Sequence, residues 1–93
     1  MAEGHLEKYL INRCNDAGVF QRKIKCAGRR GFPDRFLAKN GRLILIELKH
    51  DGGTGVLSVL QEREIARLRA VGVDVRVIDN KREIDDAIER LIK

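Results

Sequence analysis

The dipeptide Asn40-Gly41 is the feature that most constrains the fold, and it separates two runs of strand-forming residues. Asn-Gly between apolar residues is the strongest short-range signal for a β-hairpin, because both central residues of the turn need a positive φ. A two-residue turn here sets the strand register, so that Arg35 lies opposite Ile46 and the next pair along is Asp34 with Glu47. Residues directly opposite each other on antiparallel strands share a face, with Cβ atoms about 4.5–5.5 Å apart.

Two carboxylates held this close repel each other, and a stable sheet would normally avoid the pair. A divalent cation removes the conflict, since Mg²⁺ takes oxygen ligands and is often bound through one or two carboxylates. The second run, from Leu43 to Leu48, is almost continuously apolar, which is typical of a central strand covered on both sides. Because side chains alternate along a strand, Lys49 shares the face of Glu47. The sequence therefore predicts a site of two carboxylates and one ammonium at the end of a hairpin.

The segments Pro33-Asp34 and Glu47-Leu48-Lys49 resemble the signature of the PD-(D/E)XK nucleases. The wider pattern is similar to the VRR-NUC branch of that superfamily, and it consists of Arg30 to Asp34, Ile46 to Lys49, Leu57-Ser58, Gln61, and Gly72 before a valine-rich strand. This resemblance covers the chain from Glu7 to about Ile78. Val59 departs from the family pattern, which often has proline there, but the position is not catalytic.

The resemblance implies a metal-dependent nuclease with a restriction-endonuclease-like fold. In that family the aspartate and the glutamate, here Asp34 and Glu47, bind Mg²⁺ or Mn²⁺. The main-chain carbonyl that corresponds to Leu48 is a further metal ligand. The lysine, here Lys49, positions or activates water.

The resemblance also implies two supporting site residues, Gln61 and Glu7, and both have a second explanation in the residues themselves. Ser58 and Gln61 fit a capping box, in which each side chain satisfies a backbone N–H at a helix start. Glu7 lies beside the apolar stripe of a predicted helix and is equally well explained as a solvated helix glutamate. The sequence leaves both alternatives open.

Hydrophobic periodicity predicts one α/β domain over residues 1–93, with the element order α-β-β-β-α-β-α. Helices are expected at about 3–17, 57–71 and 82–93, and strands at 19–26, in the hairpin within 31–49, and at 73–78. A strand, a helix and a strand in succession imply a parallel crossover. We therefore expect a mixed central sheet flanked by helices, as in the restriction-endonuclease-like sandwich. The glycine-rich segment 50–55 is expected to be a loop beside the site, with His50 as a bystander rather than a ligand.

The formal net charge of +5 suits a polyanionic partner, although many small domains are basic for solubility alone. The residues expected to hold a nucleic-acid backbone are Lys23, Lys25, Arg29, Arg30 and Arg35. The loop that carries Arg29 and Arg30 is also explained as an ordinary solvated loop.

Composition and cysteine usage predict an intracellular protein. Cys14 and Cys26 are too few for a disulfide framework and match no zinc motif, so both are expected to be reduced thiols. No apolar run is long enough to span a membrane. We expect the cytoplasm of a bacterium or of a phage-infected host cell.

The predicted function is that of a Mg²⁺- or Mn²⁺-dependent DNA endonuclease, acting as a homodimer on branched DNA such as four-way (Holliday) junctions. The first alternative is a basic nucleic-acid-binding module without catalysis, whose binding would be indifferent to Mg²⁺. The second is a structural or interaction domain in which the Glu-x-Lys segment is a surface ion pair; it would have no affinity for nucleic acid.

Overall fold

The computed structural model describes residues 4–49 and 57–93, and these residues follow the predicted element order. Segment 50–56, which includes His50 and the expected glycine-rich loop, lies outside the described residues, as does residue 3. In chain order the elements are α1 (Gly4–Ala17), β1 (Phe20–Lys23), β2 (Arg35–Lys39), β3 (Arg42–Leu48), α2 (Val59–Ala70), β4 (Asp74–Ile78) and α3 (Lys81–Ile92).

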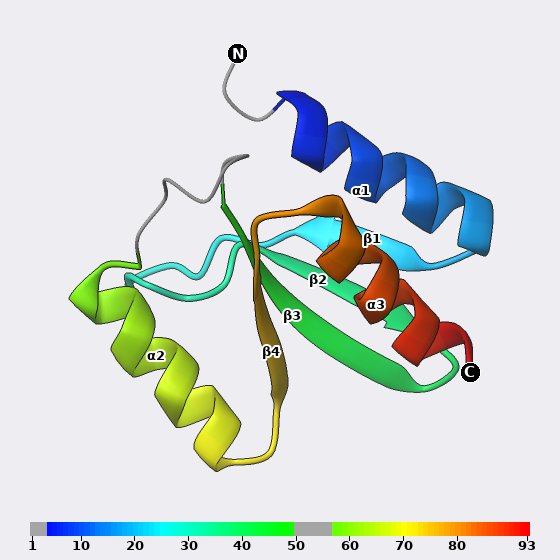
Figure 1. Ribbon diagram of the computed structural model, residues 1–93. Helices are drawn as coiled ribbons and strands as arrows, with labels where there is room; N and C mark the ends of the chain where they lie inside the picture. The colour runs from blue at the N-terminus through cyan, green and yellow to red at the C-terminus, as the bar shows by residue number, and fades with distance from the viewer. Residues whose placement is uncertain (1–3, 50–56) are drawn as a thin grey trace.

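The four strands form one mixed sheet in the order β1-β2-β3-β4 (Figure 1). The register predicted from the Asn-Gly turn is confirmed, since β2 and β3 pair Lys39 with Arg42 at the turn and Arg35 with Ile46 at the far end. Asn40 and Gly41 have φ values of 56° and 77°, as the turn requires. Strands β3 and β4 are parallel, which confirms the predicted crossover through α2.

The helices cover the sheet on both faces, with α1 and α3 on one side and α2 on the other (Figure 1). The larger core lies under α1 and α3, and its fully buried members include Leu10, Leu37, Ile44, Ile46, Ile78 and Ile88. A smaller core of Leu45, Ile65 and Val75 lies under α2. The expectation that β3 is covered along its whole length is wrong at its start, where Leu43 is 49% exposed beside the turn.

Several element ends differ from the predicted ones by one to three residues, and three of the differences have a clear local reason. The strand expected at 19–26 ends at Lys23. The backbone hydrogen bond from Ile24 N to Asp34 O is the last one between this segment and the segment of β2 before the two diverge. Helix α2 starts at Val59 rather than at residue 57, because Ser58 is its N-cap. Helix α3 starts at Lys81, one residue earlier than predicted, because Asn80 caps it by accepting a bond from Glu83 N.

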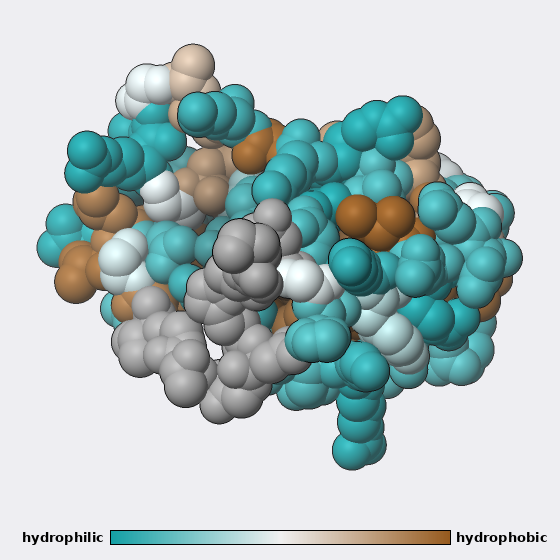
Figure 2. Space-filling model, turned by 90° about the horizontal axis from the view of Figure 1, so that it is seen from above, coloured by the Kyte–Doolittle hydropathy of each residue, from teal (hydrophilic) through white to brown (hydrophobic). Residues whose placement is uncertain are grey.

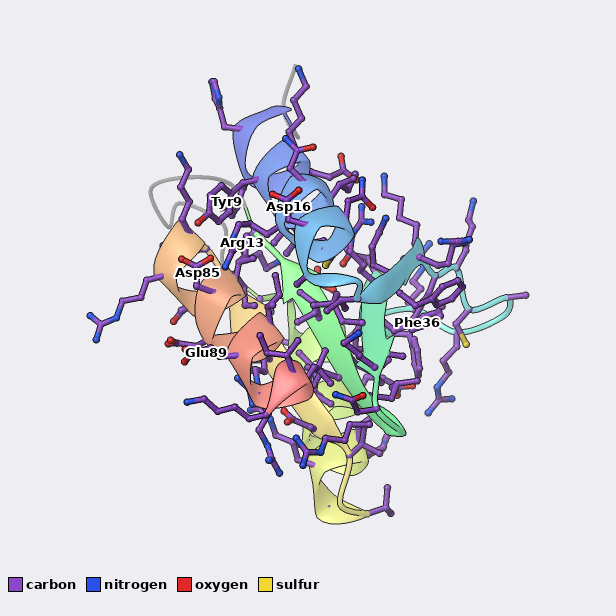
Figure 3. The ribbon with its side chains drawn as sticks, turned by 90° about the vertical axis from the view of Figure 1, so that its right-hand side faces the viewer. Tyr9, Arg13, Asp16, Phe36, Asp85 and Glu89 are labelled. Carbon is purple, nitrogen blue, oxygen red and sulfur yellow. The ribbon has the colours of Figure 1, made fainter. Side chains whose placement is uncertain are left out.

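Polar contacts fasten α1 to α3 at the side of the molecule seen in Figure 3. The Tyr9 hydroxyl and the Arg13 guanidinium both donate hydrogen bonds to the Asp85 carboxylate, at 2.9 and 3.0 Å. Cys14 is buried between these helices and the sheet, and burial raises the pKa of its thiol to about 11, so it is a poor nucleophile. Neither Cys14 nor Cys26 forms a disulfide within the described part of the chain. Of the described helices, none has the length and apolar character needed to cross a membrane.

Candidate active site

The carboxylates of Asp34 and Glu47 lie together on the sheet face that α2 covers. Asp34 directly precedes β2, one residue beyond the pair formed by Arg35 and Ile46, and Glu47 takes the matching place on β3. The Leu48 N–H points toward Asp34 Oδ1, at 3.4 Å. The juxtaposition predicted from the hairpin register is therefore present in the structure.

Gln61, at the start of α2, connects the acid on β3 to the lysine that follows it. Its amide nitrogen donates a 2.8 Å hydrogen bond to Glu47 Oε2, and its amide oxygen accepts one of 3.2 Å from Lys49 Nζ. The same oxygen accepts the N–H of Ser58, while Ser58 Oγ accepts the N–H of Gln61. The capping box is thus present, and the same side chain lies in the site.

Lys49 completes a cluster of polar side chains just beyond the end of β3. Its ammonium is 3.7 Å from Glu47 Oε2, and its side chain is 13% exposed. The backbone N–H of Lys49 donates a hydrogen bond to the carbonyl of Ile78, which holds Lys49 beside the last residue of β4. The alternation along β3 thus places Glu47 and Lys49 on one face, as predicted.

The two acids are ionised only at a cost in free energy. Burial raises the pKa of Asp34 above its ordinary value, and the bond from the Leu48 N–H and the charge of Arg35 only partly offset this. Burial also raises the pKa of Glu47, and the neighbouring Asp34 charge raises it further against the opposing effect of Lys49. A divalent cation between the carboxylates would relieve both effects.

The donor set suits a Mg²⁺ or Mn²⁺ ion with few protein ligands. It does not suit a site in which protein side chains supply every ligand. Within residues 4–49 and 57–93, no three His, Cys, Asp or Glu side chains gather closely enough to hold a metal ion. Mg²⁺ keeps several of its waters and is commonly bound through one or two carboxylates together with substrate phosphates. The oxygen donors of Asp34 and Glu47 match that preference.

Glu7 does not join this pair in the structure. Its carboxylate lies on the opposite face of the sheet, where it forms an ion pair with the buried guanidinium of Arg35 and lies 3.6 Å from Lys23 Nζ. A catalytic role for Glu7 remains a prediction from the resemblance. The contacts present give Glu7 a structural role as the counter-ion of Arg35.

The predicted phosphate-binding residues fall into two groups. Lys25, Arg29 and Arg30 are exposed in the loop between β1 and β2, which lines an open hollow of about 670 Å³. Arg35 is only 4% exposed and bonds to Gln21 and Glu7, so its assignment to the nucleic-acid surface was wrong. The register that pairs Arg35 with Ile46 directs its side chain to the α1 face, away from Asp34. Lys23 is exposed, but on the same side as Glu7.

Gly31 has a positional role that its sequence motif alone did not reveal. It has a φ of +86°, and a Cβ at this position would lie 2.6 Å from the Leu60 carbonyl oxygen and 2.9 Å from Gln61 N. The loop therefore touches the first turn of α2 through a residue without a side chain. A glycine just before Pro33-Asp34 was the only available signal.

Comparison with known proteins identifies the family. No family model matches the sequence. A protein of Acyrthosiphon pisum secondary endosymbiont phage 1, named "Putative nuclease p44", is 39% identical over 80 residues, which cover 85% of this chain and 84% of the phage protein. A solved structure titled "VRR_NUC domain" is 33% identical with a TM-score of 0.81, and the match covers 94% of each chain. The chain belongs to the VRR-NUC family.

Membership of the VRR-NUC family confirms the resemblance found in the sequence. The sheet and its three flanking helices reproduce the fold of the solved VRR-NUC domain over nearly the whole of both chains. The chain is thus a nuclease-type domain, and the cluster around Glu47 lies at its candidate active site.

Proposed function

We propose that this VRR-NUC protein is a metal-dependent endonuclease that hydrolyses phosphodiester bonds in DNA. The observation that carries the proposal is the meeting of Asp34, Glu47 and Lys49 at one end of the sheet, where Gln61 is hydrogen-bonded to Glu47 and Lys49. The name of the phage relative and the family fold support nuclease chemistry. The phage relative also supports a setting inside a bacterium or a phage-infected host cell.

Asp34, Glu47 and the main-chain carbonyl of Leu48 are the groups that would hold Mg²⁺ or Mn²⁺. When bound, the metal would lower the pKa of a water molecule and stabilise negative charge on the scissile phosphate. Lys49 would orient the attacking water or neutralise the phosphate, since its ammonium lies beside Glu47. Gln61 keeps the lysine and the glutamate in position through one hydrogen bond to each.

The exposed cations of the loop between β1 and β2 would hold the nucleic-acid backbone. Lys25, Arg29 and Arg30 lie in this loop, and Gly31 brings the loop against the start of α2. Lys23 would extend the contact on the α1 side. Contacts to phosphates make binding sensitive to salt and largely independent of sequence.

We further propose that the substrate is branched DNA, such as a four-way junction, and that the active form is a homodimer. A chain of 93 residues has little surface with which to enclose a duplex, whereas a two-fold dimer presents two active sites. Paired cuts on a junction would follow from that symmetry. A monomer bound to junction DNA, measured by light scattering, would contradict the dimer.

The test is a cleavage assay on labelled four-way junction, flap, single-stranded and linear duplex DNA, with Mg²⁺, Mn²⁺ or EDTA. We expect paired nicks in the junction that require a metal ion and are abolished by Asp34→Asn. Asp86→Asn is the matched control, because Asp86 is an exposed aspartate on α3 across the sheet. This control should cleave like the wild type.

Other outcomes separate the parts of the proposal. Cleavage of flaps or linear DNA in place of junctions would support the proposed nuclease activity and contradict the proposal that four-way junctions are the substrate. Cleavage by Asp34→Asn at the wild-type rate would reject the active site. Binding that is sensitive to salt, without cleavage under any metal, would favour the non-catalytic binding module.

A further inference from the structure

A second cationic surface lies next to the candidate active site, between the β1–β2 loop and the outer face of α2. It is a groove of about 360 Å³, and its charged lining consists of Arg29, Arg30, Arg63, Glu64 and Arg67. Figure 1 shows the loop reaching the first turn of α2, and Figure 2 shows hydrophilic and hydrophobic residues mixed at this end of the molecule. The groove is therefore strongly basic and open to solvent.

Glu64 forms ion pairs with two of the arginines of this groove, Arg29 and Arg67. Its Oε1 lies 3.5 Å from Arg29 Nε and 3.6 Å from a terminal guanidinium nitrogen of Arg67. The glutamate side chain is 13% exposed, while the arginines are 55% and 63% exposed. The carboxylate thus lies at the base of the groove, and both guanidinium groups keep most of their surface in water.

One carboxylate does not balance four arginines. Within residues 4–49 and 57–93, Arg30 and Arg63 form no ion pair. Exposed ion pairs contribute little to folding stability, so the arginines are not explained by the fold. Guanidinium groups present a planar fork of donors that matches phosphate oxygens, and the excess positive charge would attract an extended anion.

The groove and the candidate active site both include residues of the first turn of α2. Leu60 lines the groove, and its carbonyl is the atom that Gly31 approaches. The next residue, Gln61, bonds to Glu47 and Lys49. Arg63 and Arg67 follow at a spacing of four residues, which places them one above the other on one face of the helix.

We propose that this groove binds the phosphate backbone of the substrate DNA beside the bond that is cut, with Arg63 and Arg67 supplying the α2 side of the contact. The inference rests on the proposed function, because it takes the anion to be the nuclease substrate. It extends the nucleic-acid surface from the loop to the helix that also carries Gln61. The path of the strand would thus run along α2, away from Asp34 and Glu47.

Equilibrium binding to labelled linear duplex and four-way junction DNA at several salt concentrations tests the groove. The Asp34→Asn variant is the parent in every arm, so that binding is measured without cleavage. Adding Arg63→Gln with Arg67→Gln should weaken binding about tenfold and reduce the slope of log affinity against log salt by about two. The loss should be similar on both DNAs, because these contacts are made to the phosphate backbone that both DNAs share.

The matched control is Arg82→Gln with Arg90→Gln, which removes the same charge from exposed positions on α3, across the sheet. It should leave most of the affinity and most of the salt slope. Arg63→Lys with Arg67→Lys keeps the charge and should retain most of the slope. Thermal melting of every variant confirms that the compared proteins are folded.

Two results would contradict the proposal that the groove binds the DNA backbone. One is an unchanged affinity and salt slope in the Arg63 and Arg67 glutamine variant, and the other is an equal loss in the α3 control. Neither result bears on the nuclease, because metal-dependent cleavage by the otherwise wild-type protein is measured separately. Conversely, a wild-type protein that never cleaves would remove the proposed function, while the binding comparison would still report on the groove.

Discussion

At the scale of single residues, the site is defined by two acids that the fold holds in an unfavourable state. Glu47 is 6% exposed, and the charge of Asp34 adds to its burial in raising its pKa. A sheet that needed only stability would place a neutral residue at either position. The metal binding proposed above would explain why both positions carry acids.

The metal-free protein should therefore be stabilised by Asp34→Asn. Because burial raises the pKa of Asp34, its contribution to stability is fully present below the unfolded-state pKa and is lost as pH rises through the folded-state pKa. We expect the variant to melt a few degrees higher than the wild type at pH 7 in EDTA, about 4–8 °C for each kcal/mol at this chain length. The difference should shrink as the pH is lowered.

Adding Mg²⁺ should reverse that order. A ligand that binds only the folded state increases the free energy of unfolding, by about 2.7 kcal/mol at a ligand concentration of one hundred times Kd. The melting temperature rises as a result. We expect Mg²⁺ to raise the melting temperature of the wild type and to have little effect on Asp34→Asn. Melting curves that respond equally to Mg²⁺ would contradict the assignment of Asp34 as a metal ligand.

The contrast between Asp34 and Arg35 shows what the sequence could and could not predict. The Asn40-Gly41 turn set the register, and the register alone placed Asp34 beside Glu47. The same register directed Arg35 to the opposite face, but its charge suggested a surface role. The partner that makes its burial tolerable, Glu7, comes from a helix separated by 28 residues in sequence, and no local pattern links the two.

At the scale of elements, the first turn of α2 connects three parts of the site. Ser58 and Gln61 cap the helix, Gln61 reaches the end of β3, and the backbone at Leu60 contacts the β1–β2 loop through Gly31. The capping box was visible in the sequence because its spacing is local. The loop contact was not, because it depends on a positive φ and on the packing of segments far apart in the chain.

Gly31→Ala should disturb the active site without touching any of its polar groups. The new Cβ would lie 2.6 Å from the Leu60 carbonyl oxygen, so the loop and α2 must separate, and Gln61 moves with the helix. We expect a stability loss of about 1–3 kcal/mol and a fall in the cleavage rate at saturating DNA. Chemical denaturation and single-turnover cleavage measure the two effects.

Gly28→Ala is the control for backbone strain. Gly28 also has a positive φ, of +74°, but a Cβ there would meet nothing within 4 Å. This variant should lose stability through strain alone and keep its cleavage rate. If the two alanine variants cleave equally well, the contact between Gly31 and α2 does not position Gln61.

At the scale of the whole molecule, the sheet separates two charged clusters with different tasks. The candidate active site lies on the α2 face, whereas Glu7 and Arg35 lie on the α1 face. Helix α1 is held near one end by Glu7 and is linked to α3 by Tyr9 and Arg13 (Figure 3). The solved VRR-NUC domain shares this fold over nearly the whole of both chains.

Glu7→Gln should therefore destabilise the protein, because it leaves the guanidinium of Arg35, which is 4% exposed, without its carboxylate. Removing one partner of a buried pair costs about 3–5 kcal/mol, and the remaining bond from Arg35 to Gln21 places the expected loss near the lower limit. Asp16→Asn, at an exposed acid on the same helix, should change the stability little.

Adding Arg35→Met to Glu7→Gln should restore much of the lost stability, because the buried charge that lacks a partner is then removed. Equal stability of Glu7→Gln and the wild type would contradict the counter-ion role, and cleavage by the restored double variant measures the implied catalytic role separately.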